Sequence, residues 1–346
     1  PHICEIIMPL LSVIVPAYNM EHFIVSCLSS LMLDSPPKHN DIQVIVVNDG
    51  SKDQTLAVVR KFLHAGRDAI SIIDKENGNY GSCINAALQQ VRGRYVRILD
   101  ADDTFDVGEF RRFVNYLHDC DADLVLSDYV LVDCAGHVLA RRCQKRRDDY
   151  GVLDLLSDRN PVQLPAITYK TQLLRDIGYR QTEGVAYTDT EWCIWPLSAV
   201  KTITHSGCCV YRYLIGRSGQ SVSRYYDKFD DLLRVLKDLL SNTPKYSHNA
   251  CAPENAYFLA RRVADHARFV TEVLIANCSL SELQRRYSHV CNMLTDFPEV
   301  RRMFFGYCIL RKMGGLRLFA LMRNHYWLVL PIVIAYRLRL RIGGGR

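Results

Sequence analysis

Short apolar runs alternate with amphipathic stretches along the first 130 residues. Five runs rich in Val and Ile have the length of strands, at 11–18, 42–47, 69–74, 94–99 and 122–128. Segments of helical length separate the earlier runs, at 21–33, 53–65 and 81–91. Strands joined through helices require crossover connections. This half therefore predicts an α/β fold with a mostly parallel, twisted sheet flanked by helices on both faces.

Helices dominate the chain after residue 225. Apolar residues recur every three or four positions in three long segments, 227–240, 254–276 and 279–294. This spacing gives each helix an apolar face that protein must cover. We therefore predict three parts: a sheet-containing catalytic domain over 1–222, a helical region over 223–300 and a tail over 301–346.

Polar residues follow four of the predicted strands where each strand ends. Sheets of this kind bind ligands beyond the carboxyl ends of their strands, so these residues are expected along one edge. In chain order they are Pro16, Ala17, Tyr18 and Asn19; Asn48 and Asp49; Lys75 and Asn77; and Asp100, Ala101, Asp102 and Asp103.

The side chains after the first two strands suit a nucleotide. Tyr18 offers a ring face on which a base can stack, and Asn48 and Asp49 offer acceptors for the edge of uracil. The following Gly50-Ser51 turn leads into a helix whose first amides suit a phosphate. Each feature also has an ordinary explanation, because Tyr18 can simply pack and residues 48–51 can form a helix-capping turn.

Asp100 and Asp102 form a D-x-D pattern directly after an apolar strand. Like charges at this spacing repel one another unless a cation lies among them. Residues at i and i+2 of an extended strand point the same way, which suits binding of one Mg²⁺ or Mn²⁺ ion together with a diphosphate. A solvated acidic turn produces the same pattern, so the interpretation depends on what else converges there.

The composition indicates a globular protein with a sizeable core, because 49% of the 346 residues are apolar. Thirteen cysteines without a C-x-x-C pair indicate reduced thiols and a cytoplasmic location. The first 19 residues have neither a basic segment nor a cleavage-site pattern, so we expect no secretory signal. Nothing indicates nucleic-acid binding, and the basic run at 141–147 is interpreted as a solvated loop.

The net charge of +6 comes from the end of the chain. Residues 301–346 contain ten Lys or Arg and no acid, so the other 300 residues carry 33 basic and 37 acidic side chains. The apolar run 326–336 is too short to span a bilayer, which needs about 20 residues. Aromatic residues beside arginines suit the surface of an anionic membrane, and we predict peripheral binding to its inner face. The alternative is a buried C-terminal element with arginines at its rim.

Five blocks together resemble the family 2 glycosyltransferases. They are LSVIVPAYN at 11–19, IQVIVVNDGSKDQT at 42–55, ENGNYGSCINAAL at 76–88, GRYVRILDADD at 93–103 and GVAYTDTEWCIWPL at 184–197. The resemblance covers about residues 11–220 and implies the Rossmann-like GT-A fold. It also implies an inverting enzyme of bacterial polysaccharide or cell-envelope synthesis. Such an enzyme moves a sugar from a nucleotide-diphosphate sugar, here a UDP-sugar, to a hydroxyl of a glycan or lipid-linked acceptor.

The resemblance assigns roles to individual residues. Tyr18, Asn48 and Asp49 would hold the base. Asp100 and Asp102 would lie near the ribose, the diphosphate and a Mn²⁺ or Mg²⁺ cofactor.

Inverting transfer needs a base for the acceptor hydroxyl and charge neutralisation for the departing diphosphate. The resemblance makes Asp189 the base, and Glu191 competes for that role or orients the acceptor. This chain departs from many relatives in having Thr188 where they have Glu.

A second departure concerns the diphosphate. Many relatives have an Arg before the residue matching Asn85, whereas this chain has Ile84, so Lys75, Arg97 or Arg217 must meet the diphosphate. Arg217 lies in a Gly-flanked segment, 211–223, that suits either a flexible cover or a surface turn. The predicted nucleotide-sugar site comprises Pro16, Ala17, Tyr18, Asn19, Asn48, Asp49, Lys75, Asn77, Asn85, Asp100, Ala101, Asp102 and Arg217.

Two other functions remain open. A sugar nucleotidyltransferase also has an α/β sheet and acidic metal ligands, but it would carry a Gly-rich, basic loop after the first strand, which residues 16–19 lack. A non-catalytic nucleotide-sugar-binding protein would have lost either the metal acids or the base, and this chain keeps both.

Overall fold

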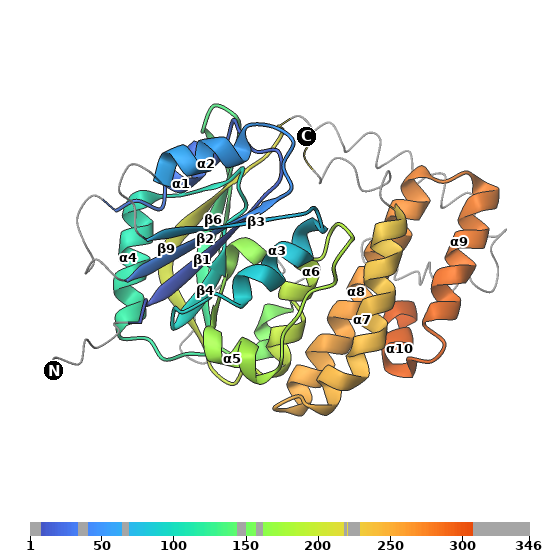
Figure 1. Cartoon of the computed structure of the whole chain (residues 1–346). Helices are drawn as coiled ribbons and strands as arrows, with labels where there is room; N and C mark the ends of the chain where they lie inside the picture. The colour runs from blue at the N-terminus through green and yellow to red at the C-terminus, as the bar shows by residue number, and fades with distance from the viewer. Residues whose placement is uncertain are drawn as a thin grey trace. The chain divides into compact units, whose positions relative to one another are not determined.

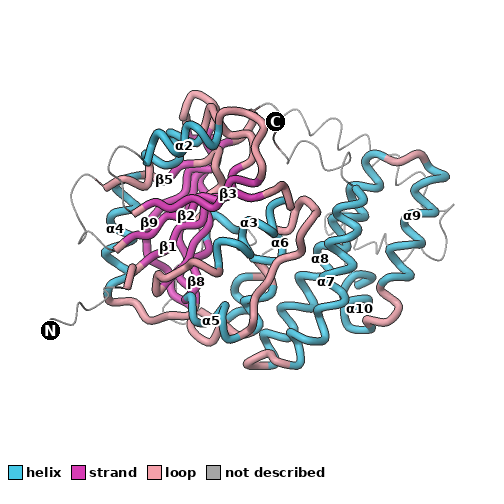
Figure 2. The backbone as a smooth tube through the Cα atoms, viewed as in Figure 1, coloured by secondary structure: helices cyan, strands magenta, loops and turns pink. Residues whose placement is uncertain are grey.

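The computed structural model describes residues 8–33, 41–63, 69–143, 150–156, 162–217, 220 and 229–306. The chain divides into two compact units, 1–218 and 219–346. All described strands belong to the first unit, whereas the described elements of the second are helices (Figures 1 and 2).

Nine strands form one sheet among the described residues of the first unit. They are β1 (Leu11–Ala17), β2 (Ile42–Asp49), β3 (Ile70–Lys75), β4 (Tyr95–Ile98), β5 (Thr104–Phe105), β6 (Leu124–Val132), β7 (Val138–Arg142), β8 (Ile167–Lys170) and β9 (Ile203–Leu214). The α-helices of this unit are α1 (Ile24–Ser29), α2 (Thr55–Leu63), α3 (Asn79–Leu88), α4 (Val107–His118), α5 (Thr171–Asp176) and α6 (Asp189–Trp192). Single 3₁₀ turns lie at Val152–Leu155, Leu164–Ala166 and Trp195–Ser198.

The first four predicted strands form the parallel half of the sheet, in the order β3-β2-β1-β4. The runs of β1, β2 and β4 are almost wholly buried because helices cover both faces, with α3 and α4 on opposite sides of the strands, whereas the edge strand β3 is only partly buried (Figure 1). The pairing of β1 with β2 runs from Leu11 opposite Ile42 to Ala17 opposite Asn48. The polar residues after these strands therefore start side by side.

Beyond β4 the sheet is mixed. The order continues β8-β6-β9-β5, with β7 beside β6. The predicted strand at 122–128 is β6, which runs antiparallel to its neighbour β8 and continues to Val132 before a hairpin leads into β7. The predicted α/β sheet flanked by helices is confirmed, and four antiparallel pairings complete it.

The described residues of the second unit form the three predicted helices and a fourth. They are α7 (Phe229–His248), α8 (Pro253–Asn277), α9 (Leu280–Met293) and α10 (Pro298–Gly306). Apolar side chains such as Leu236, Val263 and Leu283 are fully buried, as the three- and four-residue spacing predicts.

Helix α10 crosses the predicted boundary between residues 300 and 301. Its Phe304 is fully buried, so the first six residues assigned to the tail belong to this helix. The remainder of the predicted tail, 307–346, lies outside the described residues. None of the described helices combines the length and the apolar composition needed to cross a bilayer.

Candidate active site

The loops after β1 and β2 are joined by hydrogen bonds. The backbone amide of Asn19 donates to Ser51 Oγ at 3.1 Å, and Asn19 Oδ1 accepts from the Lys52 amide at 2.8 Å. Asn19 has a positive φ of 54°, a conformation that asparagine tolerates better than most residues. Pro16 and Ala17 are buried in β1, whereas Tyr18 is 40% exposed and presents its ring at the sheet edge.

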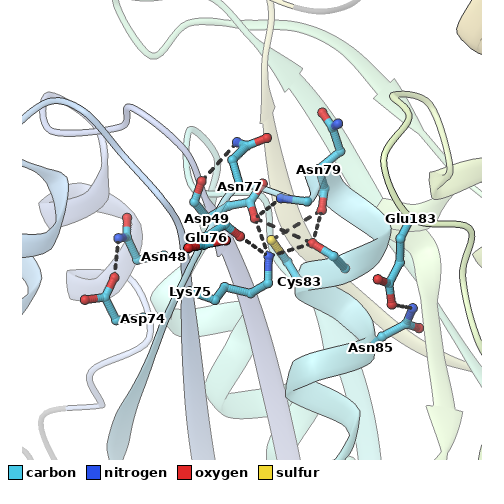
Figure 3. Close-up of polar contacts among 12 residues, drawn as sticks. Asn48, Asp49, Asp74, Lys75, Glu76, Asn77, Asn79, Cys83, Asn85 and Glu183 are labelled. Atoms are coloured by element: carbon cyan, nitrogen blue, oxygen red, sulfur yellow. Dashed lines mark hydrogen bonds and ion pairs between the residues drawn. The ribbon is translucent and has the colours of Figure 1, made fainter.

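A polar cluster lies at the ends of β2 and β3 and the start of α3 (Figure 3). Lys75 Nζ donates to Asp49 Oδ1 at 2.7 Å and to Ser82 Oγ at 2.8 Å. The Gly78 amide donates to the same Asp49 oxygen at 2.9 Å, and Asn77 Nδ2 donates to the Asp49 carbonyl at 3.0 Å. Asp49 is therefore held in one orientation by the stretch 75–78, which leads from β3 to α3.

Asn48 points to a different partner from Asp49. Its Nδ2 donates to Asp74 Oδ1 at 2.8 Å (Figure 3). Neighbouring residues of a strand face opposite sides of the sheet, so Asn48 and Asp49 have different partners, and their joint binding of a base stays a prediction. The structure thus gives Asp49 the position beside Asn77 and leaves Asn48 bonded to β3.

Asp100 and Asp102 lie in a turn between β4 and β5. The Asp103 amide donates to the Asp100 carbonyl at 2.9 Å, which closes this turn. The expectation that both carboxylates point the same way because they sit on an extended strand is therefore wrong. Their proximity comes from the turn, since β4 already ends at Ile98.

The three acids of this turn have different partners. Asp100 Oδ1 accepts from the Tyr80 hydroxyl at 2.9 Å, and Asp102 Oδ2 forms an ion pair with Arg217 Nε at 2.5 Å. Asp103 is buried and accepts from the Tyr211 hydroxyl and the Leu214 amide, both at 2.7 Å. Asp103 thus fixes the turn to β9, while Asp100 and Asp102 form the acid pair.

The two carboxylates of the acid pair lie close together where the surrounding protein limits their contact with water. Burial, followed by repulsion from Asp102, raises the pKa of Asp100 to about 7. The Tyr80 hydrogen bond and the Arg217 cation act in the opposite direction but do not cancel these effects. Two carboxylates that repel one another in this way fit a divalent cation that takes its other ligands from phosphate and water.

Asp189 begins α6 and lies close enough to the acid pair for its charge to act on Asp100. It is the first residue of the helix and is solvent-exposed, and its charge contributes to raising the pKa values of Asp100 and Tyr80. Desolvation by the surrounding protein raises the pKa of Asp189 itself. A carboxylate that is accessible and yet poorly solvated suits proton abstraction, because its proton affinity is increased.

Glu191 does not share this exposure. It is buried, and its Oε2 accepts from the Thr182 amide at 2.9 Å. Asn85 is also buried, and its side-chain amide bonds to Gln181 and Glu183, not to the base-binding cluster (Figure 3). Both residues hold protein segments near the site.

The structure separates the three cations considered for the diphosphate. Arg97 is fully buried; its guanidinium donates to Ser127 Oγ at 3.0 Å and to the Pro165 carbonyl. It cannot reach a ligand, so that hypothesis is wrong. Lys75 is bound to Asp49, which leaves Arg217, beside Asp102, as the cation at the acid pair.

Two residues of the site escaped sequence reasoning. Tyr80 joins α3 to Asp100, and Ser82 joins the same helix to Lys75. Both belong to the block 76–88, where a tyrosine and a serine at the start of a helix after a strand end were the available signal.

Comparisons with known proteins relate this chain to glycosyltransferases. Residues 12–160 match a family model described as Glycosyl transferase family 2. The chain is 27% identical to the uncharacterized glycosyltransferase MG060 of Mycoplasma genitalium over 238 residues, which is 67% of this chain and 79% of that protein. It is 28% identical to the poly(ribitol-phosphate) beta-N-acetylglucosaminyltransferase TarS of Staphylococcus aureus over 228 residues, which is 65% of this chain and 39% of TarS.

Solved structures show the same fold. The crystal structure of residues 1–349 of S. aureus TarS in complex with UDP-GlcNAc superposes with a TM-score of 0.69 at 22% identity. The superposition covers 96% of this chain and 92% of that one.

Proposed function

We propose that this chain is a family 2 glycosyltransferase that moves a sugar from a UDP-sugar to an acceptor hydroxyl with inversion of the anomeric carbon. The observation that carries the proposal is the placement of Asp189. It is exposed, its pKa is raised, and its charge acts on Asp100 of the acid pair.

The donor's base is assigned to the edge formed by β1, β2 and β3. Tyr18 supplies an exposed ring for stacking, and Asp49 supplies an acceptor that Lys75 and Gly78 hold in place. Asn77 lies beside Asp49 and adds an amide. Support for uridine as the nucleoside comes from the UDP-GlcNAc that the TarS structure contains.

The diphosphate is assigned to the acid pair and Arg217. Asp100 and Asp102 would hold a Mn²⁺ or Mg²⁺ ion, which supplies charge neutralisation for the departing diphosphate. Arg217 already lies against Asp102 and over the Phe23 ring, 5.4 Å from its centroid. Its guanidinium can donate to phosphate oxygens from that position.

Removal of the proton from the acceptor hydroxyl is assigned to Asp189. Inversion requires the acceptor oxygen to attack from the side opposite the leaving group, so one carboxylate suffices as the base. The raised pKa of Asp189 brings its proton affinity closer to that of a useful base at neutral pH. Glu191 is buried against Thr182 and is proposed to hold the chain instead.

The acceptor is proposed to be a glycan or lipid-linked precursor of a bacterial cell-surface polymer. Support comes from the name of TarS, a poly(ribitol-phosphate) beta-N-acetylglucosaminyltransferase. A sugar nucleotidyltransferase is the second candidate, but no specific observation favours it, since the loop after β1 is not glycine-rich.

The test uses a panel of nucleotide sugars with Mn²⁺. We expect the purified protein to release UDP from one or more UDP-sugars, slowly with water and faster with a cell-envelope acceptor, as measured by a coupled UDP assay. A sample that releases pyrophosphate from a nucleoside triphosphate instead would identify a nucleotidyltransferase. Tight UDP-sugar binding without any turnover would identify a non-catalytic binding protein.

The basic tail is proposed to hold the enzyme at the cytoplasmic face of the membrane. The helices up to Gly306 are part of the folded second unit, so the membrane-binding segment is assigned to 307–346. That segment keeps eight of the ten cations and the apolar run 326–336. It combines about 1 kcal/mol for each cation near anionic lipid with an apolar contribution that salt does not screen.

Truncation after Gly306 tests this proposal. We expect the full chain to sediment with vesicles of anionic phospholipid and to be partly released by high salt, because only the charge contribution is screened. The chain 1–306 should stay in the supernatant and still hydrolyse the donor, since Tyr18, Asp102 and Asp189 are retained. Equal sedimentation of both proteins would show that the tail belongs to the protein core.

A further inference from the structure

Residues 181–184 pass between α3 and α6, and we call them the bridge segment. α3 carries Tyr80, which bonds to Asp100, and α6 begins with Asp189. The bridge segment is bonded both to the helix that carries Tyr80 and to the helix that begins with Asp189. The inference below rests on the proposed role of Asp189.

On one side, Asn85 of α3 binds the bridge segment through three hydrogen bonds. Its Nδ2 donates to the Gln181 carbonyl at 2.8 Å and to Glu183 Oε1 at 2.7 Å. Its Oδ1 accepts from the Gln181 amide at 2.9 Å. One side chain thus forms hydrogen bonds with both the backbone amide and the backbone carbonyl of Gln181. These bonds fix the position of the bridge segment along the axis of α3.

Glycines let the backbone approach α3 directly. A Cβ added at Gly81 would lie 1.9 Å from the Thr182 carbonyl oxygen, so no other residue fits there without moving the chain. The Gly184 amide donates to the Gly78 carbonyl at 2.9 Å. The bridge segment therefore lies against the first two turns of α3 without intervening side chains.

On the other side, the segment is bonded to both flanks of Asp189. Gln181 Nε2 donates to the carbonyl of Thr188, the residue before Asp189, at 2.7 Å. The Thr182 amide donates to Oε2 of Glu191, two residues after Asp189, at 2.9 Å. Gln181, Thr188 and Glu191 are all buried, so these bonds are shielded from water.

Asp189 itself needs such support. Its helix is only four residues long, and the preceding Tyr187 has a positive φ of 66°. A single helical turn next to a strained residue has little stability of its own. The bonds from Gln181 and to Glu191 supply the constraint that the short helix lacks.

We propose that Asn85, Gln181 and Glu191 are positioning residues that set Asp189 against the acid pair through the bridge segment. The arrangement explains why the second acid of the T-D-T-E-W block is buried and not exposed beside Asp189. It also gives Asn85 a task that does not involve the nucleotide.

Methionine variants test the proposal because methionine keeps the side-chain length and removes the hydrogen bonds. We expect Gln181→Met and Glu191→Met to lower kcat about 10–100-fold, the effect of misplacing a catalytic group by roughly 1 Å. Their affinity for UDP should change by less than about threefold, since no bridge contact reaches Tyr18 or Asp49. Glu191→Gln keeps an acceptor for the Thr182 amide and should retain more than about a third of kcat.

Gln43 provides the matched control. It is a buried glutamine of the same unit that accepts from Ser12 Oγ at 2.6 Å and donates to the Gln90 carbonyl at 2.9 Å. It lies near the amino end of β2, away from the site residues at the carboxyl end. Gln43→Met should lower the melting temperature like Gln181→Met, while kcat per folded molecule stays within about twofold of wild type.

A double mutant separates this proposal from the assignment of Asp189. If Gln181 acts through Asp189, Gln181→Met adds no further loss in an Asp189→Asn background. Bridge variants that lose only stability, as Gln43→Met does, would overturn the positioning role while Asp189→Asn remains inactive. Full activity of Asp189→Asn would instead overturn the base assignment. Should Gln181→Met fail to fold, the comparison of Glu191→Gln with Glu191→Met decides alone.

Discussion

Asp189→Asn is expected to lower sugar transfer by about 10²–10⁴-fold and to leave the affinity for UDP-sugar close to that of wild type. Asparagine has the shape of aspartate but cannot accept the acceptor's proton. The side chain is exposed at the start of α6, so the substitution disturbs little packing. Initial rates at saturating donor and acceptor, with UDP-sugar affinity from calorimetry, measure the two effects separately.

The pH dependence of transfer gives a second reading of Asp189. The ionised form is the active one, so the rate should rise with pH through the pKa of Asp189. Because desolvation raises that pKa, the rise should occur at a higher pH than for a fully solvated aspartate. The residual activity of Asp189→Asn should not show this rise with pH. A variant with nearly full activity, or a selective loss in Glu191→Gln, would place the base elsewhere.

The parallel half of the sheet could be read from the sequence because its signals are local. β1 and β2 carry apolar residues on both faces, β3 and β4 are short runs rich in Ile and Val, and helices with periodic apolar residues lie between β1 and β4. Parallel pairing then follows from the crossover connections. The polar residues after each strand are consequently found at the carboxyl ends of neighbouring strands, as expected.

The mixed half could not be read in the same way. β8 has four residues, and β9 runs through Ile203–Leu214 with polar and cysteine residues that give no regular alternation. These strands are defined by their partners, since β8 fills the space between β4 and β6. Pairing between distant segments leaves little trace in a short sequence window.

The sequence predicted which residue types form the site and at which strand ends they lie, but not which groups their side chains contact. Arg97 illustrates the difference, because an arginine in a strand before an acid cluster suits a phosphate. Its guanidinium instead lies over the rings of Phe105 and Phe113, 5.1 Å and 5.3 Å from their centroids. Successive residues of a strand point to opposite faces of the sheet, and the sequence gives no indication that the face on which Arg97 lies is the core.

Asp102→Asn is expected to have the largest effect on catalysis, abolishing measurable transfer. The substitution removes one of two carboxylates from a pair that suits a divalent cation. It also removes the ion-pair partner of Arg217. UDP affinity should fall strongly when Mn²⁺ is present and change little in EDTA, because only the metal-dependent part of binding is lost.

Two further variants separate the cation from the ion pair at Asp102. Arg217→Met removes the other partner of that pair and should weaken UDP binding in Mn²⁺ and in EDTA alike, since a guanidinium contact to phosphate does not need the metal. Asp121→Asn is the matched control, because Asp121 also forms an ion pair with a cation, Lys170 at 2.7 Å. Unlike Asp102, it is exposed, and it follows α4 and does not belong to the turn between β4 and β5. It should behave as wild type. If Asp102→Asn bound UDP as tightly as wild type in Mn²⁺, the acid pair would not be the metal site, and the raised pKa of Asp100 would reflect burial beside Asp102 alone.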